Sequence, residues 1–202
     1  MMQLYIDFKC PASYLALKPT LALSEQLGVP IGWHAMRSYQ SPLMDEKPHE
    51  EVGQRHRRVR ALARQKTHQL YAQVQNLPLN FRNPPTNTDM ALAALCLLTE
   101  RGDNPLPFIT AAFEAYWTGD ADLNDARTVA ALSGAPAFPD GDENGDGARA
   151  RLEAALIEAE ENGIFTSPTY VVQDVVQDEV SAQIFVGREH LPWIRELLQS
   201  GK

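Results

Sequence analysis

The patterns typical of β-strands lie near the two ends of this 202-residue chain. Between about residues 48 and 163, apolar residues recur at helical spacing and there is almost no strand signal. A sheet of more than two strands therefore has to combine segments from both ends, with a long helical stretch between them. The hydrophobic content of 44% is sufficient for a sizeable core, so the length suits one domain, or a small domain that carries a large insertion.

The first forty residues have the pattern of a β-α-β unit. Polar and apolar side chains alternate over residues 3–8, which predicts a strand. Helical spacing follows as far as Leu27, where Gly28 and Pro30 end the helix, and residues 31–36 predict a second strand. Because a helix connects the two strands, we expect them to run parallel.

The remaining segments complete the predicted fold. Helical periodicity predicts five further helices, over residues 51–74, 89–101, 106–117, 123–132 and 148–162. Two strands that pair as a hairpin and a last helix follow, over residues 168–172, 183–186 and 188–198. The sequence thus predicts an α/β fold with β-α-β and β-β-α halves. Residues 1–42 and 163–202 would form one discontinuous domain, and residues 43–162 an α-helical insertion.

Composition and charge exclude several classes of function. The net charge is −8, from 18 basic and 26 acidic residues, so the chain repels phosphate backbones and we expect no nucleic-acid partner. No apolar run reaches the ~18 residues that a membrane span needs, and no charged-then-apolar leader follows Met1, so we expect a cytoplasmic protein without membrane contact. No spacing typical of a zinc site or of a phosphate-binding loop occurs, and we expect no metal.

Cys10 lies where the first strand ends and the first helix begins. A helix N-terminus presents unpaired N–H groups and about half a positive charge, which favour a thiolate. This placement predicts that the pKa of Cys10 falls from ~8.5 into the range of ~3.5–7.5, which would make the thiol nucleophilic. Pro11 suits the first helical turn, and Ser13 is placed to donate a hydrogen bond to the sulfur. The alternative is a buried, inert cysteine.

A second feature is the segment from Thr166 to Tyr170, in which Pro168 opens a strand. A proline at this position can follow a cis peptide bond, which would expose the backbone of Ser167 to a ligand. The alternative is a trans proline at the start of an edge strand.

Together these segments resemble a known family. The motifs are Cys-Pro-Ala-Ser at residues 10–13, Ser-Pro-Thr-Tyr-Val-Val at 167–172 and Ile-Phe-Val-Gly-Arg-Glu-His-Leu at 184–191. They resemble the DsbA-like thioredoxin superfamily, and most closely its branch of 2-hydroxychromene-2-carboxylate isomerases and kappa-class glutathione transferases. The resemblance runs over nearly the whole chain and implies a thioredoxin-like fold with a helical insertion.

The resemblance also implies roles for particular residues. Cys10 falls where disulfide oxidoreductases have their attacking cysteine and where the isomerase and transferase branch has a serine that handles the glutathione sulfur. Ser13 takes the second position of a Cys-x-x-Cys pair. Pro168 matches the cis-proline of the family, Ser167 the residue whose backbone pairs with the cysteinyl part of glutathione, and Glu189 an acidic residue that binds the γ-glutamyl amine. The implied cofactor is therefore glutathione, and its expected binding residues are Pro11, Ser167, Pro168, Arg188 and Glu189.

The activity that follows is a glutathione-linked thiol-disulfide oxidoreductase or isomerase. Because Ser13 leaves Cys10 without a resolving neighbour, Cys10 would act as a monothiol nucleophile on a small-molecule electrophile or a mixed disulfide. One alternative is a glutathione-dependent cis-trans isomerase of the 2-hydroxychromene-2-carboxylate type, or a kappa-like transferase. Another is a non-catalytic binding module on a thioredoxin scaffold.

Other features carry less specific expectations. Cys96, in an apolar helix, is expected to be a core residue, and the tryptophans are expected in the core or at a subunit interface. The basic block from Arg55 to Lys66 has three interpretations: a cationic wall over the active site, an RNA-binding face, or a solvated helix surface. Exposed apolar faces of the insertion are compatible with a homodimer. The segment from Asp140 to Asp146 partly imitates a calcium loop, and a mobile acidic loop is the preferred interpretation.

Overall fold

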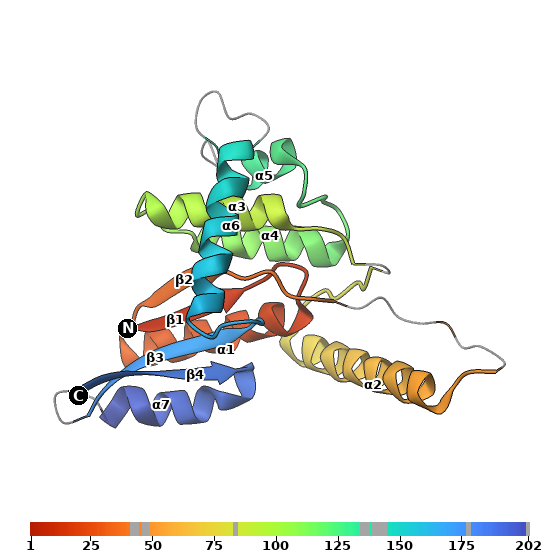
Figure 1. Ribbon diagram of the computed structural model, residues 1–202, viewed down its shortest axis with the longest axis horizontal. Helices are drawn as coiled ribbons and strands as arrows, with labels where there is room; N and C mark the ends of the chain where they lie inside the picture. The colour runs from red at the N-terminus through yellow and green to blue at the C-terminus, as the bar shows by residue number, and fades with distance from the viewer. Residues whose placement is uncertain are drawn as a thin grey trace.

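Both ends of the chain contribute to one mixed sheet in the computed structural model, which describes residues 1–40, 45, 49–82, 85–133, 138, 145–176 and 179–200. The strand order is β2-β1-β3-β4 (Figure 1), and the strands are β1 (Met2–Ile6), β2 (Ile31–Ala35), β3 (Thr169–Val176) and β4 (Glu179–Val186). β1 pairs parallel with β2, as predicted, and antiparallel with β3, which in turn pairs antiparallel with β4. The predicted α/β architecture is confirmed.

Helices cover both faces of this sheet. Leu4 of β1 and Tyr170 of β3 are paired and buried in the same core as residues of α1 (Pro11–Leu27) and α7 (Leu191–Ser200). The alternate side chains Tyr5 and Val171 belong to a second cluster with residues of α6 (Asp146–Glu161). Since side chains alternate between the faces of a strand, α6 lies on the opposite face from α1 and α7 (Figure 1).

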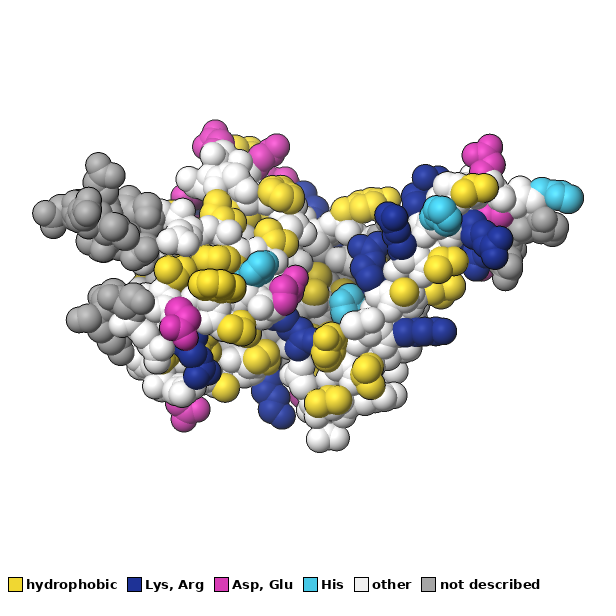
Figure 2. Space-filling view, turned by 90° about the horizontal axis from the view of Figure 1, so that it is seen from below, with side chains coloured by type: hydrophobic (Ala, Val, Ile, Leu, Met, Phe, Trp, Pro, Cys, Tyr) yellow, Lys and Arg dark blue, Asp and Glu magenta, His cyan; other side chains and the backbone are white. Residues whose placement is uncertain are grey.

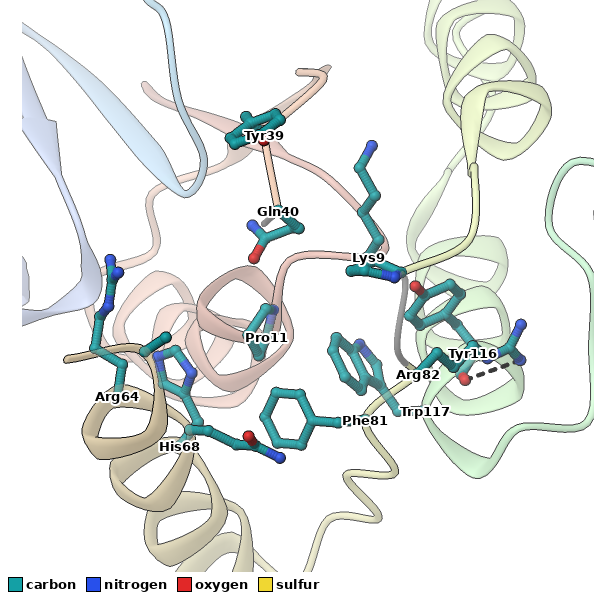
Figure 3. A pocket seen from close by; sticks show the side chains of 13 residues that line it. Lys9, Pro11, Tyr39, Gln40, Arg64, His68, Phe81, Arg82, Tyr116 and Trp117 are labelled. Carbon is teal, nitrogen blue, oxygen red and sulfur yellow. Dashed lines mark hydrogen bonds between the residues drawn. The ribbon is translucent and has the colours of Figure 1, made fainter. Parts of the chain in front are cut away.

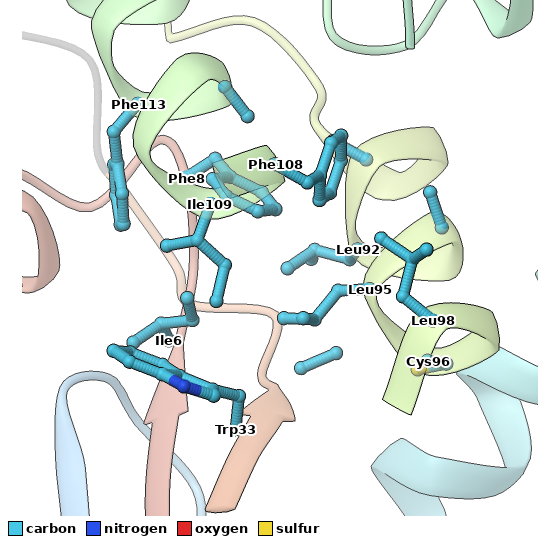
Figure 4. Packing of buried hydrophobic residues seen from close by; sticks show 14 of the residues in the cluster. Ile6, Phe8, Trp33, Leu92, Leu95, Cys96, Leu98, Phe108, Ile109 and Phe113 are labelled. Carbon is cyan, nitrogen blue, oxygen red and sulfur yellow. The ribbon is translucent and has the colours of Figure 1, made fainter. Parts of the chain in front are cut away.

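The largest part of the core lies beside β2, where α3 (Asp89–Glu100) and α4 (Leu106–Thr118) pack against the sheet (Figure 4). The side chains from Met90 to Leu98 of α3 are all buried, as their apolar character predicted. The ring of Phe8 lies 5.7 Å from that of Phe108 and 5.1 Å from that of Phe113, measured between centroids. One core therefore extends from the sheet into the helices that follow it. The division into domains at residues 42 and 163 stays a prediction.

One helix of the central stretch, α2 (Val52–Gln75), extends away from this core (Figure 1). Among its described side chains only Ala72 is buried. Its exposed large apolar residues are Val52, Val59, Leu62, Leu70, Tyr71 and Val74. Lys and Arg side chains gather on the part of the molecule that α2 forms (Figure 2). The helix ends at Gln75, and its C-cap Asn76 has a φ of 54°, the left-handed conformation that asparagine tolerates.

Several element boundaries differ from the predicted ones. β3 and β4 are longer than residues 168–172 and 183–186, because their backbone pairing continues from Gln173 opposite Ala182 to Val176 opposite Glu179. Backbone pairing does not require an apolar pattern. α5 (Ala126–Ser133) begins three residues later than predicted, because the Asp125 carboxylate accepts hydrogen bonds from the Thr128 backbone and hydroxyl, both at 2.8 Å. A short 3₁₀ turn, η1 (Arg188–His190), precedes α7.

Trp33 and Trp117 are buried, whereas Trp193 is 68% exposed in the single chain. No described helix is both long and apolar enough to cross a membrane. Within the described ranges, no three His, Cys, Asp or Glu side chains are grouped so that they could hold a metal ion. The segment 140–144, which carries most of the calcium-loop motif, lies outside the described residues.

Candidate active site

The turn between β1 and α1 places Cys10 at the N-cap of the helix. The Cys10 backbone N–H donates to the Asp7 carbonyl at 3.0 Å, and the Cys10 carbonyl accepts from the Tyr14 N–H at 3.2 Å. Pro11 is the first helical residue, a position at which its missing N–H leaves no hydrogen bond unmade. The thiol thus sits at the positive end of α1, where the sequence predicted it.

The Cys10 side chain meets the opposite end of the chain. Its Sγ donates a hydrogen bond to the Ser167 carbonyl oxygen at 3.3 Å, and the side chain is only 3% exposed. The peptide bond between Ser167 and Pro168 is cis. The antiparallel pairing of β1 with β3 produces this contact. Tyr5 lies opposite Thr169, so the segment that follows β1 lies beside the segment that precedes β3.

The protonation state of the Cys10 thiol differs from the one that the sequence predicted. Burial raises the pKa of Cys10 above its ordinary value, and the negative charge of Asp7 raises it further. The hydrogen bonds to Ser167 and Ser13 lower the pKa but do not outweigh the loss of solvent. The prediction of a lowered pKa is therefore wrong: in this structure Cys10 is a neutral thiol, because desolvation outweighs the hydrogen bonds that lower its pKa.

No second thiol assists Cys10 among the described residues. Ser13 is buried, and its Oγ accepts a hydrogen bond from the Asp7 N–H at 3.4 Å. Cys96 is a free thiol in the core of α3, as predicted, and burial raises its pKa to about 12. A dithiol cycle through these two cysteines has no support in this arrangement.

A cavity of about 290 Å³ lies beside the turn (Figure 3). Lys9 and Pro11, the neighbours of Cys10 in sequence, line it, whereas Cys10 itself does not. The other lining residues come from α2, α4 and the two segments that follow β2 and α2; they are Tyr39, Gln40, Ala61, Arg64, Gln65, His68, Phe81, Arg82, Pro85, Tyr116 and Trp117. The cavity therefore combines aromatic faces with cationic groups, which suits a planar anion.

Two buried polar atoms near these residues have no hydrogen-bond partner within the described part of the chain. They are the indole Nε1 of Trp117 and the hydroxyl Oγ of Ser167. Trp117 is 2% exposed and lines the cavity, while Ser167 supplies the carbonyl that Cys10 contacts. Buried polar groups are normally paired, so both are candidates for contacts with a bound molecule.

Arg188 and Glu189 lie close in space to Pro168, because the N–H of the preceding residue, Gly187, donates a hydrogen bond to the Pro168 carbonyl at 2.9 Å. The Arg188 guanidinium stacks over the ring of Tyr71 in α2, 4.0 Å from its centroid. Both residues line a recess of about 390 Å³ together with Pro19, Tyr71 and Leu191. The structure thus places these two predicted ligands outside the lining of the cavity beside Pro11.

The basic block divides between two environments. Arg64 lines the cavity, together with His68 just beyond the block. Burial, together with the charges of Arg188 and Arg64, lowers the pKa of His68. Arg58 pairs with Glu50 at 2.9 Å. The cationic-wall interpretation therefore gains support for Arg64, while exposed members outside the cavity lining, such as Arg57, fit a solvated surface.

Sequence reasoning did not identify Asp7, Lys9, Phe81 or Trp117 as site residues. Asp7 had no distinct signal, because it takes a polar position in the alternating pattern of residues 3–8. Phe81 and Trp117 had none, because an aromatic residue in a cavity wall has the same local pattern as one in the core.

Comparisons with known proteins agree with this architecture. The chain matches the model of the DSBA-like thioredoxin domain over residues 1–199. The structure resembles a 2-hydroxychromene-2-carboxylate isomerase, with a TM-score of 0.67, 17% identity, and coverage of 98% of this chain and 94% of that chain. It also resembles a putative protein disulfide isomerase from Nitrosomonas europaea (TM-score 0.66, 15% identity, 98% and 95% covered). A third likeness is to the cytosolic disulfide reductase DsbM from Pseudomonas aeruginosa, with a TM-score of 0.61, 16% identity, and coverage of 98% of this chain and 97% of that chain. The structure of DsbM with GSH also matches. No curated protein matches the sequence.

Proposed function

Because the chain belongs to the DSBA-like thioredoxin domain family, we propose that it is a glutathione-dependent isomerase or transferase. In this proposal the neutral thiol of Cys10 turns its single S–H from the Ser167 carbonyl to the glutathione sulfur and donates a hydrogen bond to it. The observation that carries the proposal is the Cys10 Sγ–H directed at the Ser167 carbonyl, in a buried site that raises the thiol pKa. A neutral donor at a helix N-terminus stabilises an anionic sulfur, as a serine hydroxyl would.

Bound glutathione would supply the sulfur nucleophile for reversible addition to an activated double bond. The residues present fit such a ligand at several positions. The Ser167 hydroxyl is buried without a partner among the described residues, and the Ser167 carbonyl already faces the reacting position. Arg188 and Glu189 follow close by and offer opposite charges for the two ends of a glutamyl group. The likeness to DsbM in its form with GSH agrees with this fit.

The second substrate would occupy the cavity beside Pro11. Phe81, Tyr116 and Trp117 provide aromatic faces, and Lys9 and Arg64 provide positive charge. The Trp117 N–H would donate to an oxygen of the substrate, a contact that it lacks within the described residues. An aromatic compound with a carbonyl or carboxylate beside its double bond has this chemistry.

The test compares Cys10→Ser with Cys10→Ala, using glutathione and the aromatic enone benzylideneacetone as probes. Serine keeps a donor at the same position, so we expect Cys10→Ser to retain conjugation within about threefold and Cys10→Ala to lose roughly a hundredfold, the effect of one transition-state donor. Calorimetry of glutathione binding separates a binding defect from a catalytic one. If both variants and the wild type conjugate at the uncatalysed rate, the enzyme proposal is wrong. If in addition none of them binds glutathione, the binding-module alternative is supported.

A second candidate is a monothiol disulfide oxidoreductase, which the adjacency of Cys10 Sγ to Ser167 favours. The Cys10 sulfur would attack one sulfur of a glutathione mixed disulfide, forming a new disulfide and releasing the other sulfur as a thiol. The pKa of Cys10 would then have to fall when substrate binds. This candidate predicts that Cys10→Ser abolishes reduction of the mixed disulfide, whereas the first proposal predicts that the serine variant stays active in conjugation.

A further inference from the structure

Asp7 is a fully buried acid whose carboxylate accepts hydrogen bonds from three different parts of the fold. Its Oδ2 accepts from the Ser38 N–H at 2.7 Å and from the Ser38 hydroxyl at 2.9 Å, and it pairs with the Lys9 ammonium at 2.9 Å. Its Oδ1 accepts from the Thr88 hydroxyl at 2.8 Å and from the Lys9 N–H at 3.3 Å. Both oxygens are therefore fully used, which is the condition under which a buried carboxylate is tolerated.

These partners belong to separate structural units. Ser38 follows β2 in the sheet, Thr88 is the N-cap of α3 in the helical stretch, and Lys9 lines the cavity. The backbone of Asp7 adds two further bonds, since its carbonyl accepts from the Cys10 N–H and its N–H donates to the Ser13 hydroxyl. The β1–α1 turn is thus fixed to the sheet and to α3 through a single side chain.

From this arrangement we infer that Asp7 is a positioning residue of the site. Its carboxylate holds the Cys10 turn against α3 and pairs with the ammonium of Lys9, a residue that lines the cavity, and its negative charge favours Cys10 as an uncharged hydrogen-bond donor over the thiolate. The purpose of that donor rests on the proposed function, while the effect of Asp7 on the thiol does not.

The electrostatic surroundings support this role. Among the described residues, Asp7 carries the charge that adds to burial in raising the pKa of Cys10. Lys9 faces Asp7 from the same turn, and Tyr116 faces it from α4, where Asp7 contributes to raising the Tyr116 pKa. Arg82 lies 4.6 Å from the Tyr116 ring centroid and lowers that pKa. Removing the Asp7 charge should therefore favour the thiolate of Cys10.

The test is the pH dependence of Cys10 alkylation by iodoacetamide, followed by mass spectrometry of the peptide that contains Cys10. Asp7→Asn keeps the side-chain shape and removes the charge. We expect its Cys10 to react roughly fivefold faster than wild type at pH 7.5, because its pKa is lower and reactivity follows the thiolate fraction. A folded Asp7→Asn protein with a wild-type alkylation profile would show that Asp7 has only a structural role and would overturn the inference.

Asp89→Asn is the matched control. The Asp89 carboxylate also joins the end of β2 to α3, through two hydrogen bonds from Arg37 at 3.0 Å, but within the described part of the chain it makes no hydrogen bond or ion pair with the Cys10 turn. We expect it to leave the alkylation profile of Cys10 unchanged, and an equal acceleration in both variants would contradict a specific role for Asp7.

If Asp7→Asn does not fold, Lys9→Met provides the opposite test. Removing the cation leaves the Asp7 charge less compensated, so we expect Cys10 to react more slowly than wild type; a faster reaction would overturn the inference. Alkylation requires no glutathione, so the failure of this inference is distinguishable from failure of the proposed function. A shifted Cys10 pKa in a protein that neither binds nor uses glutathione would leave the role of Asp7 intact and disprove the proposed function.

Discussion

The Cys10 Sγ donates a hydrogen bond to the carbonyl oxygen of Ser167, 3.3 Å away and 157 residues further along the chain. The contact depends on the pairing of β1 with β3, in which Leu4 lies opposite Tyr170 and Tyr5 opposite Thr169. A shift of this register by one residue would also reverse the faces of the buried side chains, so the core enforces the contact. The candidate site therefore forms only when both ends of the chain are folded together.

Alkaline solution should destabilise the protein through its buried thiols. The folded-state pKa values of Cys10 and Cys96 are raised above the unfolded value, that of Cys96 to about 12. Each neutral thiol contributes fully to the stability of the folded protein below the unfolded-state pKa, near 9. That contribution is lost as the pH rises toward the folded-state pKa. We expect the free energy of unfolding, measured by urea titration, to fall between pH 8.5 and 10.5. A smaller fall is expected in Cys96→Ala, and an identical fall in that variant would contradict this assignment.

The cavity should bind a planar anion through the indole N–H of Trp117, which has no partner within the described residues. Trp117→Phe keeps an aromatic ring against Tyr14, with which Trp117 stacks at 6.2 Å, and against Phe81, but removes the donor. Because a hydrogen bond to a charged group contributes about 1.5–3 kcal/mol, we expect the dissociation constant for trans-cinnamate, measured by calorimetry, to rise at least tenfold. Benzyl alcohol, which lacks the carboxylate, serves as the control ligand. Equal affinities of the two proteins for cinnamate would show that the indole N–H does not face the ligand.

Arg64 should contribute to anion binding more than arginines of α2 that lie outside the cavity lining. Both Arg64 and Arg57 are exposed, but Arg64 lines the cavity and Arg57 is not among the lining residues. We expect Arg64→Gln to weaken cinnamate binding several-fold at low ionic strength and Arg57→Gln to change it less than twofold, with the difference shrinking in 0.5 M salt because salt screens charges. Equal effects of the two substitutions would indicate a diffuse field of the helix in place of a defined wall.

Burial should separate the stability effects of two apolar substitutions. Leu92 in α3 is fully buried, so Leu92→Ala should lower the free energy of unfolding by about 2–5 kcal/mol. Val59 on α2 is half exposed in the single chain, and Val59→Ala should lower it by less than about 1 kcal/mol. Urea unfolding across a range of protein concentrations measures both. A large, concentration-dependent effect of Val59→Ala would contradict the exposure of α2 and would support the homodimer that its apolar side chains suggest.

Much of the fold follows from local sequence pattern. The apolar run of α3 predicted a buried helix, and the alternation in residues 3–8 predicted a strand with one buried face. Cys10 and Pro168 marked the two segments that the sheet brings together. The bounds of β3 and β4 could not be predicted, because their outer residues pair through the backbone without an apolar pattern.

The protonation of Cys10 could not be predicted from its position at a helix start. Its pKa depends on how deeply the folded chain buries the sulfur and on the nearby charge of Asp7, and both are properties of the tertiary structure. The partners of Asp7 are equally non-local, because Ser38 and Thr88 reach it from different elements. The role of the Trp117 N–H becomes visible only when the cavity around it is known.

The thiol pKa of bound glutathione, measured from the thiolate absorbance near 240 nm across pH, tests the central claim most directly. If the neutral thiol of Cys10 donates to the glutathione sulfur, that pKa should lie well below the value in free solution in the wild type and in Cys10→Ser, and should return toward the solution value in Cys10→Ala. The account would be contradicted by bound glutathione that titrates as it does in free solution in the wild type, or by Cys10→Ala behaving as the wild type does.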